Sequence, residues 1–183
     1  PAAGETVSCT VTNTQNPGSI QVCKETIPDG ALTSFGFELD GPTDGLPTSA
    51  SLVDDECSEP VVVAVGSGYS ITEDDVAGWD LTDASCDNDS EVDDISVEAD
   101  EDVVCTFTNT QRGSITVIKN AIGGDGTFGF TASYGDFSIN TGVSTQNVAP
   151  NLVPGPYSVV EDTPNAGWDY NGVECDDDDG GND

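Results

Sequence analysis

The stretch Cys9-Thr-Val-Thr-Asn-Thr-Gln15, followed closely by Gly18-Ser-Ile-Gln-Val22, is the part of the sequence that decides the fold. It returns as Cys105-Thr-Phe-Thr-Asn-Thr-Gln111, followed by Gly113-Ser-Ile-Thr-Val117. Each copy indicates one strand, a very short connection and the next strand. Recurrence at a long period is typical of repeated domains.

The motifs after each copy also recur in the same order. They are Phe35-Gly-Phe37 and Phe128-Gly-Phe130, Gly68–Glu73 and Gly155–Glu161, Ala77-Gly-Trp79 and Ala166-Gly-Trp168, and Cys86 and Cys175. The copies therefore predict a lone strand within 1–17, module one over 18–111, and module two over 112–183. Module two has no closing Cys-Thr-Phe-Thr-Asn strand of its own, while residues 5–14 are such a strand without a module.

The composition indicates an all-β chain outside the cell. The 183 residues include 21 Gly and 10 Pro among Val-, Ile- and Thr-rich segments, as expected for strands joined by many turns. A formal net charge of −32 excludes nucleic acid and anionic membranes as partners. No apolar run is long enough to cross a bilayer, so direct membrane insertion is not expected. Histidine is absent, which removes the commonest general base.

The order Gly-Ser-Ile-x-Val-x-Lys, Gly-x-Tyr-Ser-x-x-Glu, Ala-Gly-Trp and x-Phe-Thr-Asn-Thr resembles the prealbumin-like, Cna protein B-type (SpaA-like) repeat domains. Those domains occur in bacterial surface adhesins and pilin shafts. The resemblance covers nearly the whole chain and implies two tandem prealbumin-like (Ig-like) β-sandwich modules. It implies that the first and last strands of a module lie side by side. It also implies an isopeptide bond between a lysine on the first strand and an asparagine on the last, promoted by a buried acid.

Strand parity independently selects the residues for that chemistry in module one. Successive side chains of a strand point to opposite faces. Lys24 therefore shares the inward face of Ile20 and Val22, Glu73 follows Tyr69 and Ile71, and Asn109 follows Cys105 and Phe107. In module two the same argument selects Lys119 and Glu161, and Asn13 of the lone strand is the corresponding asparagine. The chain has only these two lysines, and both fall at the equivalent position.

Two outcomes stay open for the cluster of Lys24, Glu73 and Asn109. Burial disfavours the charged lysine and the charged carboxylate, so a neutral amine can attack the asparagine amide and expel ammonia. The alternative is a buried Lys–Glu ion pair that is hydrogen-bonded to the asparagine without a covalent bond. In neither case is the chain expected to be an enzyme, beyond this autocatalytic step.

The six cysteines lack metal-type spacing and favour disulfides in an oxidising compartment. We predict Cys86–Cys105, which closes the hairpin around an acidic loop, and Cys23–Cys57, which holds a long loop over the outer face of its strand. Cys9 and Cys175 then remain as a pair between neighbouring molecules.

Acidic loops occupy the same place in the two modules and could hold calcium, although their spacing differs from an EF-hand and a charge run is usually a solvated loop. No other cofactor is expected. The candidate ligands are Asp87, Asp89, Asp93, Asp176, Asp178 and Asp183.

The sequence as a whole favours a structural subunit of an extracellular, cell-surface filament, pilus-like shaft or adhesin stalk. Its partners would be copies of itself, joined head to tail by strand 5–14 completing module two of the next copy. A continuous chain of repeats would make the same contacts. The alternative function is a ligand-binding adhesin module for a glycan or host protein within such a long chain. A secreted hydrolase is disfavoured, because no Gly-x-Ser-x-Gly motif is present.

Overall fold

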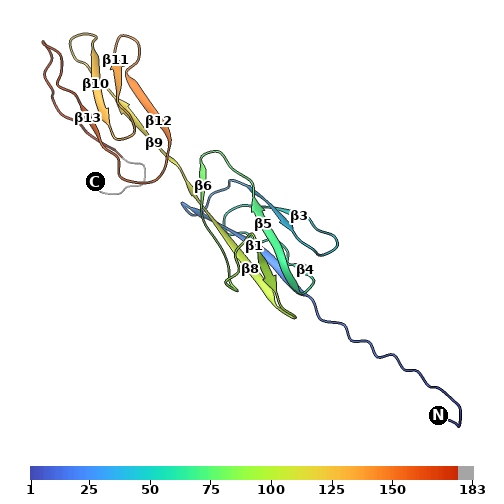
Figure 1. The fold of residues 1–183 in the computed structure, drawn as a ribbon. Coiled ribbons are helices and arrows are strands. Elements are labelled where there is room, and N and C mark those ends of the chain that lie inside the picture. Colours follow the sequence, from blue (N-terminus) through green and yellow to red (C-terminus); the bar gives the residue numbers. More distant parts are fainter. Residues whose placement is uncertain (177–183) are drawn as a thin grey trace. The chain divides into compact units, whose positions relative to one another are not determined.

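The computed structural model describes residues 1–176. It divides the chain into two compact units, Pro1–Arg112 and Gly113–Asp183, which contain module one and module two. All regular elements are strands (Figure 1). Over the described residues, no helix is long and apolar enough to cross a membrane.

Module one is a sandwich of two four-stranded sheets. The first sheet has the order β4 (Val61–Val63), β1 (Gly18–Ile27), β8 (Asp102–Gln111) and β6 (Trp79–Cys86). The second has the order β3 (Thr48–Leu52), β2 (Phe35–Asp40), β5 (Gly66–Glu73) and β7 (Ile95–Val97). The all-β class expected from composition is therefore observed.

The core of module one lies between these sheets and follows the two-residue period of each strand. In β1, β2, β5 and β8, alternate side chains are buried and those between them are more exposed. The buried apolar set from these strands is Ile20, Val22, Phe35, Phe37, Leu39, Tyr69, Ile71, Val103, Cys105 and Phe107. The run Val61–Val63 is only a short edge strand. Its middle residue, Val62, points outward because the alternation continues to the edge of the sheet.

The first and last strands of module one lie side by side, as the family resemblance implied. β1 and β8 pair in parallel, with Val22 opposite Cys105, Lys24 opposite Phe107 and Thr26 opposite Asn109. β8 also pairs antiparallel with β6. Consequently β8 is the shared partner that joins β1 to β6 within the first sheet.

Both disulfides predicted within module one are present. Cys86 and Cys105 are directly opposed on β6 and β8. Cys23 bonds to Cys57, which forms an isolated antiparallel bridge to it. Backbone hydrogen bonds such as that from the Lys24 amide to the Glu56 carbonyl set the segment before β4 along the edge of β1, so the prediction that it covers the outer face of that strand was wrong.

Residues 1–17 do not form the strand that their alternation predicts. They have no strand assignment, and Val11 is 84% exposed. A strand is defined by hydrogen bonds to a neighbouring strand, and none of the described residues pairs with this segment as a strand would. The alternation of a strand is present in this segment, but the alternation alone does not provide the hydrogen-bonded partner that a strand needs.

Module two forms two smaller sheets. β9 (Gly113–Ile118) pairs with β12 (Gln146–Leu152), and β10 (Thr127–Ala132) lies between β11 (Phe137–Asn140) and β13 (Val159–Glu161). Its buried core consists of Phe128, Phe130 and Ile139. Within 113–176 no strand corresponds to β8. Residues 168–175, which correspond to β6 in the motif order, have no strand assignment.

Candidate functional site: a buried lysine, glutamate and asparagine

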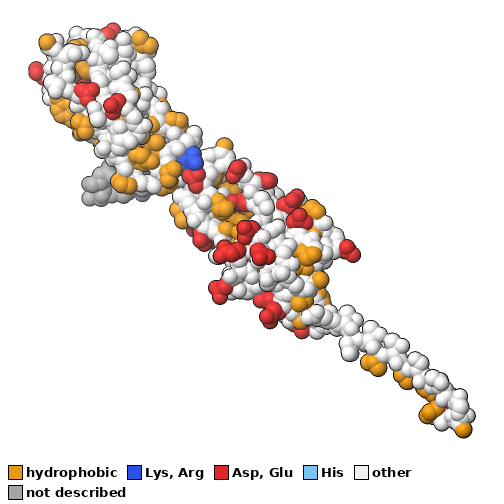
Figure 2. All heavy atoms as spheres, in the orientation of Figure 1, with side chains coloured by type: hydrophobic (Ala, Val, Ile, Leu, Met, Phe, Trp, Pro, Cys, Tyr) orange, Lys and Arg blue, Asp and Glu red, His pale blue; other side chains and the backbone are white. Residues whose placement is uncertain are grey.

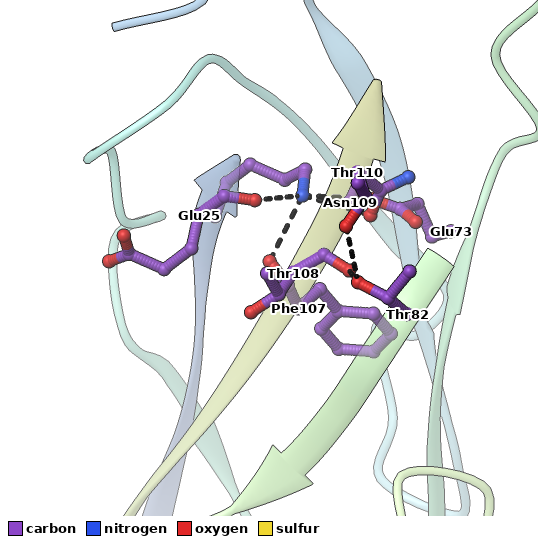
Figure 3. A network of polar contacts seen from close by, with 8 residues as sticks. Glu25, Glu73, Thr82, Phe107, Thr108, Asn109 and Thr110 are labelled. Carbon is purple, nitrogen blue, oxygen red and sulfur yellow. Dashed lines mark hydrogen bonds and ion pairs between the residues drawn. The ribbon is translucent and has the colours of Figure 1, made fainter. Parts of the chain in front are cut away.

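Lys24 lies in the interior of module one, where it continues the inward row of β1. Its side chain is 0% exposed. The ammonium nitrogen donates hydrogen bonds to three oxygens: the Glu25 carbonyl at 2.6 Å, the Phe107 carbonyl at 3.0 Å and Oδ1 of Asn109 at 2.9 Å (Figure 3). The nitrogen also lies 4.4 Å from the centre of the Phe35 ring, a favourable position for a cation.

Glu73 supplies the acid at the end of β5. Its Oε1 lies 3.6 Å from Nζ of Lys24 and accepts no hydrogen bond. Burial raises the pKa of Glu73, although hydrogen bonding to Asn109 and the charge of Lys24 oppose the rise. Burial likewise lowers the pKa of Lys24, opposed chiefly by Glu73. Both shifts favour the neutral pair, an amine beside a carboxylic acid.

The three side chains therefore meet as parity predicted, one from each of β1, β5 and β8. The Nζ–Oδ1 hydrogen bond places the lysine nitrogen beside the asparagine amide group that it would attack. The same contacts also describe a satisfied buried ion pair. The geometry brings the reacting groups together, and whether the bond forms stays a prediction.

An aromatic ring also lies beside the lysine, and the site predicted from the sequence did not include it. Phe35 contacts Lys24, and in module two Phe128 lies 4.4 Å from Nζ of Lys119 in the same way. The repeated Phe-Gly-Phe motif could have indicated these aromatic residues. Its glycine leaves room for the neighbouring acid, because a Cβ on Gly36 would lie 2.3 Å from Oδ2 of Asp74 unless that side chain moved.

Module two contains the lysine and the glutamate of the same site. Nζ of Lys119 lies 2.8 and 3.0 Å from the two carboxylate oxygens of Glu161. The lysine side chain is 18% exposed, and over residues 113–176 no asparagine side chain hydrogen-bonds to this pair. Asn13, the predicted third member, lies in the exposed segment 1–17. Cys9 and Cys175 are both exposed free thiols, and their predicted pairing between neighbouring molecules stays a prediction.

The predicted calcium loop of module one is not borne out by the geometry. The carboxylates of Asp87, Asp89 and Asp93 do not form a cluster of metal-ligand spacing. Asp87 instead accepts a hydrogen bond from the Val104 amide, which fastens the loop to β8. Asp176 also belongs to no such cluster, and Asp178 and Asp183 lie outside the described residues.

One carboxylate cluster does occur in the described part of the chain. Glu25, Asp54 and Asp55 have carboxylate oxygens within 4.8 Å of one another. Their separation in sequence hides this proximity. The Cys23–Cys57 disulfide and backbone hydrogen bonds such as that from the Asp55 amide to the Lys24 carbonyl hold the segment before β4 beside β1.

Module one consists of two stacked β-sheets, and its first and last strands are adjacent. With the buried lysine on the first strand, this arrangement is that of a prealbumin-like β-sandwich. The chain belongs to the prealbumin-like fold domain family, whose model matches twice, over residues 20–111 and 115–183. This SpaA-like class is typical of bacterial surface proteins and typically non-enzymatic. Together with the two disulfides, it points to the cell exterior.

A similar solved structure is the Bacillus anthracis TIE protein. It is 18% identical, with a TM-score of 0.43 over 85% of this chain and 30% of that chain, so this chain spans less than a third of it. Curated protein sequences gave no match.

Proposed function

We propose that the chain is a structural subunit of an extracellular filament, pilus-like shaft or adhesin stalk, and that module one carries an internal isopeptide bond. The observation that carries the proposal is the contact of Lys24 with Asn109 beside Glu73. A buried lysine held by three acceptors and a buried acid costs desolvation free energy that an apolar core would avoid. Covalent locking of the first strand to the last is a function that accounts for this arrangement.

The reaction balances without an added reagent. The neutral Lys24 amine attacks Cγ of Asn109, a new C–N bond forms, and the bond from Cγ to the amide nitrogen breaks. The Glu73 carboxylic acid gives its proton to the departing nitrogen and regains one from the lysine nitrogen, so ammonia leaves and the acid is restored. The apolar surroundings and the Phe35 ring keep water from competing for the carbonyl carbon.

Trypsin tests this bond sharply, because the chain has only three cleavage sites, Lys24, Arg112 and Lys119. An acylated lysine is not cut. After reduction and denaturation, a cross-linked chain should yield residues 1–112 as one piece, whereas an ion pair should yield 1–24 and 25–112 separately. Intact mass should show the loss of one ammonia.

The variants for this experiment are Glu73→Ala and Asn109→Ala, which should both restore cleavage at Lys24. Asp75→Ala is the matched control, since it removes an exposed acid two residues from Glu73 and should leave Lys24 protected. Cleavage at Lys24 in the unaltered protein would favour the ion pair and remove the main support for the proposal.

The proposed subunits join head to tail by strand complementation. Residues 5–14, hereafter the donor segment, have the alternation of a strand but lack a partner in the described structure. Over residues 113–176, module two has no strand that corresponds to β8. A contact between different surfaces of identical copies does not close on itself, and it therefore propagates into a filament. Negative-stain microscopy of the full chain, beside a variant lacking residues 1–15, tests this assembly. Filaments formed by the shortened chain would contradict it.

A further inference from the structure

We infer that Glu25, Asp54 and Asp55 form a calcium-binding site on module one, in which the ion joins β1 to the segment before β4. The site is distinct from the lysine cluster, because Lys24 and Glu25 are consecutive on β1 and their side chains therefore point to opposite faces. Figure 3 shows the carboxylate of Glu25 directed away from Asn109. The inference is independent of the isopeptide bond proposed above.

The three carboxylates have the spacing of ligands that share one calcium ion. One oxygen from each residue lies within 4.8 Å of the oxygens from the other two. Because calcium binds oxygen at about 2.3–2.6 Å, two oxygens of one coordination shell are at most about 5 Å apart. Calcium takes about six to eight oxygen ligands and accepts carboxylates through one or both oxygens, with water in the remaining positions. The cluster therefore fits calcium without a large rearrangement.

The backbone holds the two segments of the site together before any ion binds. The Asp55 amide donates a hydrogen bond to the Lys24 carbonyl at 2.9 Å, and the Lys24 amide donates one to the Glu56 carbonyl at 2.8 Å. The neighbouring disulfide, Cys23–Cys57, closes the same pairing covalently. Since the fold has already ordered both segments, little of the binding free energy is spent on ordering them.

Asp54 gives the independent indication that a ligand belongs here. The residue is buried, with only 8% exposure, although it is an acid. Its Oδ2 accepts a hydrogen bond from the Gly30 amide at 2.6 Å, whereas its Oδ1 accepts none from the described residues. A buried carboxylate oxygen without a partner is costly, because it has lost its water and gained nothing in exchange. A cation held between Asp54 and the two neighbouring carboxylates would be that partner.

The protein has no basic side chain to spare for this position. Each of its three basic residues is paired with an acid outside the cluster. The pairs are Lys24 with Glu73, Arg112 with Asp80, and Lys119 with Glu161. Acidic side chains also crowd the visible surface of module one in Figure 2, and such a field concentrates cations from solution. The neutralising charge must therefore come from outside the chain.

A fourth carboxyl group, that of Asp29, lies beside the cluster. Hydrogen bonding to Asp54 and the charge of Asp55 raise the pKa of Asp29. Without a cation, a proton on this group relieves part of the repulsion among the carboxylates. A divalent ion would relieve more of it, and Asp29 would then be free to ionise as a further oxygen ligand.

Bound calcium would fasten three parts of module one to one another. Glu25 lies near the end of β1, Gly30 lies in the turn that follows, and Asp54 and Asp55 lie in the segment before β4. Extracellular calcium modules bind with dissociation constants of about 10⁻⁴–10⁻³ M. A site in that range would be filled outside a cell and would stabilise the edge of the sandwich there by mass action.

Calorimetric titration of calcium chloride into the full chain tests the site, in about 0.15 M salt to screen diffuse attraction. One saturable site is expected, with a dissociation constant of about 10⁻⁴–10⁻³ M. Glu25→Gln and Asp55→Asn each remove one ligand charge from an exposed residue and should weaken binding about tenfold or more. Asparagine tolerates the φ of 62° at residue 55. Glu59→Gln is the matched control, because it removes an exposed charge from the same segment outside the cluster and should change the affinity less than about twofold.

Amide NMR spectra of the full chain locate the ion. Calcium should first shift the resonances of Gly30 and Asp55, and magnesium should bind about tenfold more weakly, because it demands octahedral geometry and keeps its waters. Equal binding by Glu25→Gln and Glu59→Gln, or shifts centred on residues 87–94, would overturn the site. Equal affinity for magnesium would overturn calcium as its ligand. None of these outcomes changes trypsin cleavage at Lys24, so the inference and the proposed isopeptide bond fail separately.

Discussion

Replacement of Glu73 by Gln should remove about 4 kcal/mol from the free energy of unfolding of module one. Gln preserves the size of the side chain but cannot relay a proton, so the Lys24–Asn109 bond should not form. That bond would close a loop across a sequence separation of 85. By the loop-entropy relation for cross-links, such a loop is worth about 4.6 kcal/mol in a chain without other cross-links.

The disulfides reduce this value. The shortest covalent path from Lys24 to Asn109 passes through Cys23–Cys57 and Cys86–Cys105, so only the chain between those bonds remains free to form a loop. That path has roughly 35 residues, for which the relation gives about 3.8 kcal/mol. For a module of this size, the change corresponds to a fall in Tm of about 15–30 °C.

The assay is denaturant unfolding followed by tryptophan fluorescence. A Trp168→Phe background leaves Trp79 as the single reporter, because the chain has two tryptophans. Asp75→Ala is the control and should change the free energy of unfolding by less than about 0.5 kcal/mol, since the residue is exposed. A Glu73→Gln loss under about 1 kcal/mol, in a protein whose Lys24 is shown to be acylated, would refute the loop-entropy reasoning.

The remaining predictions concern the disulfide, the core and pH. Cys86→Ser together with Cys105→Ser should lower the free energy of unfolding by about 3 kcal/mol, as expected for a separation of 19 and measurable in the same assay. Phe107→Ala should cost about 3–5 kcal/mol, because the ring is buried edge-on against Phe37, and a loss below 1 kcal/mol would contradict its place in the core. In Asn109→Ala, which cannot form the bond, burial keeps the pKa of Glu73 above its ordinary value of 4.5. The native state then binds more protons than the unfolded state, so stability should fall as pH rises from about 4.5 through the raised pKa. The double variant Glu73→Gln with Asn109→Ala should lose that part of the pH dependence, and an unchanged pH profile would show that Glu73 is not the cause.

Much of module one could be predicted from the sequence because strand parity is a local property. The inward rows of β1, β5 and β8 end in Lys24, Glu73 and Asn109, and the alternation alone was enough to aim all three at one interior. The disulfide Cys86–Cys105 followed from its position at the ends of a hairpin. The repeat then carried the same reasoning to Lys119 and Glu161.

The features that could not be predicted from the sequence depend on contacts between residues that are distant along the chain. Residues 5–14 alternate like a strand, but whether they form one is decided by a hydrogen-bonded neighbour. The carboxylates of Glu25 and Asp54 come together because a disulfide and backbone hydrogen bonds hold their segments side by side. The acidic loop after Cys86 suggested calcium by composition, whereas its geometry is set by hydrogen bonds such as that from Val104 to Asp87.

The parallel pairing of β1 and β8 also determines how module one would respond to tension. A pull applied at Gly18 and at Gln111 acts on opposite ends of two adjacent parallel strands, so it shears their whole register at once rather than unzipping it pair by pair. A bond from Lys24 to Asn109 would transmit that tension through a few residues of β1 and β8. The residues between Lys24 and Asn109 would then bear no load. Without the bond, yielding would also release the separation of 85 residues that the bond would span, or about 300 Å of extended chain once the disulfides are also open. With the bond, single-molecule stretching should find module one inextensible.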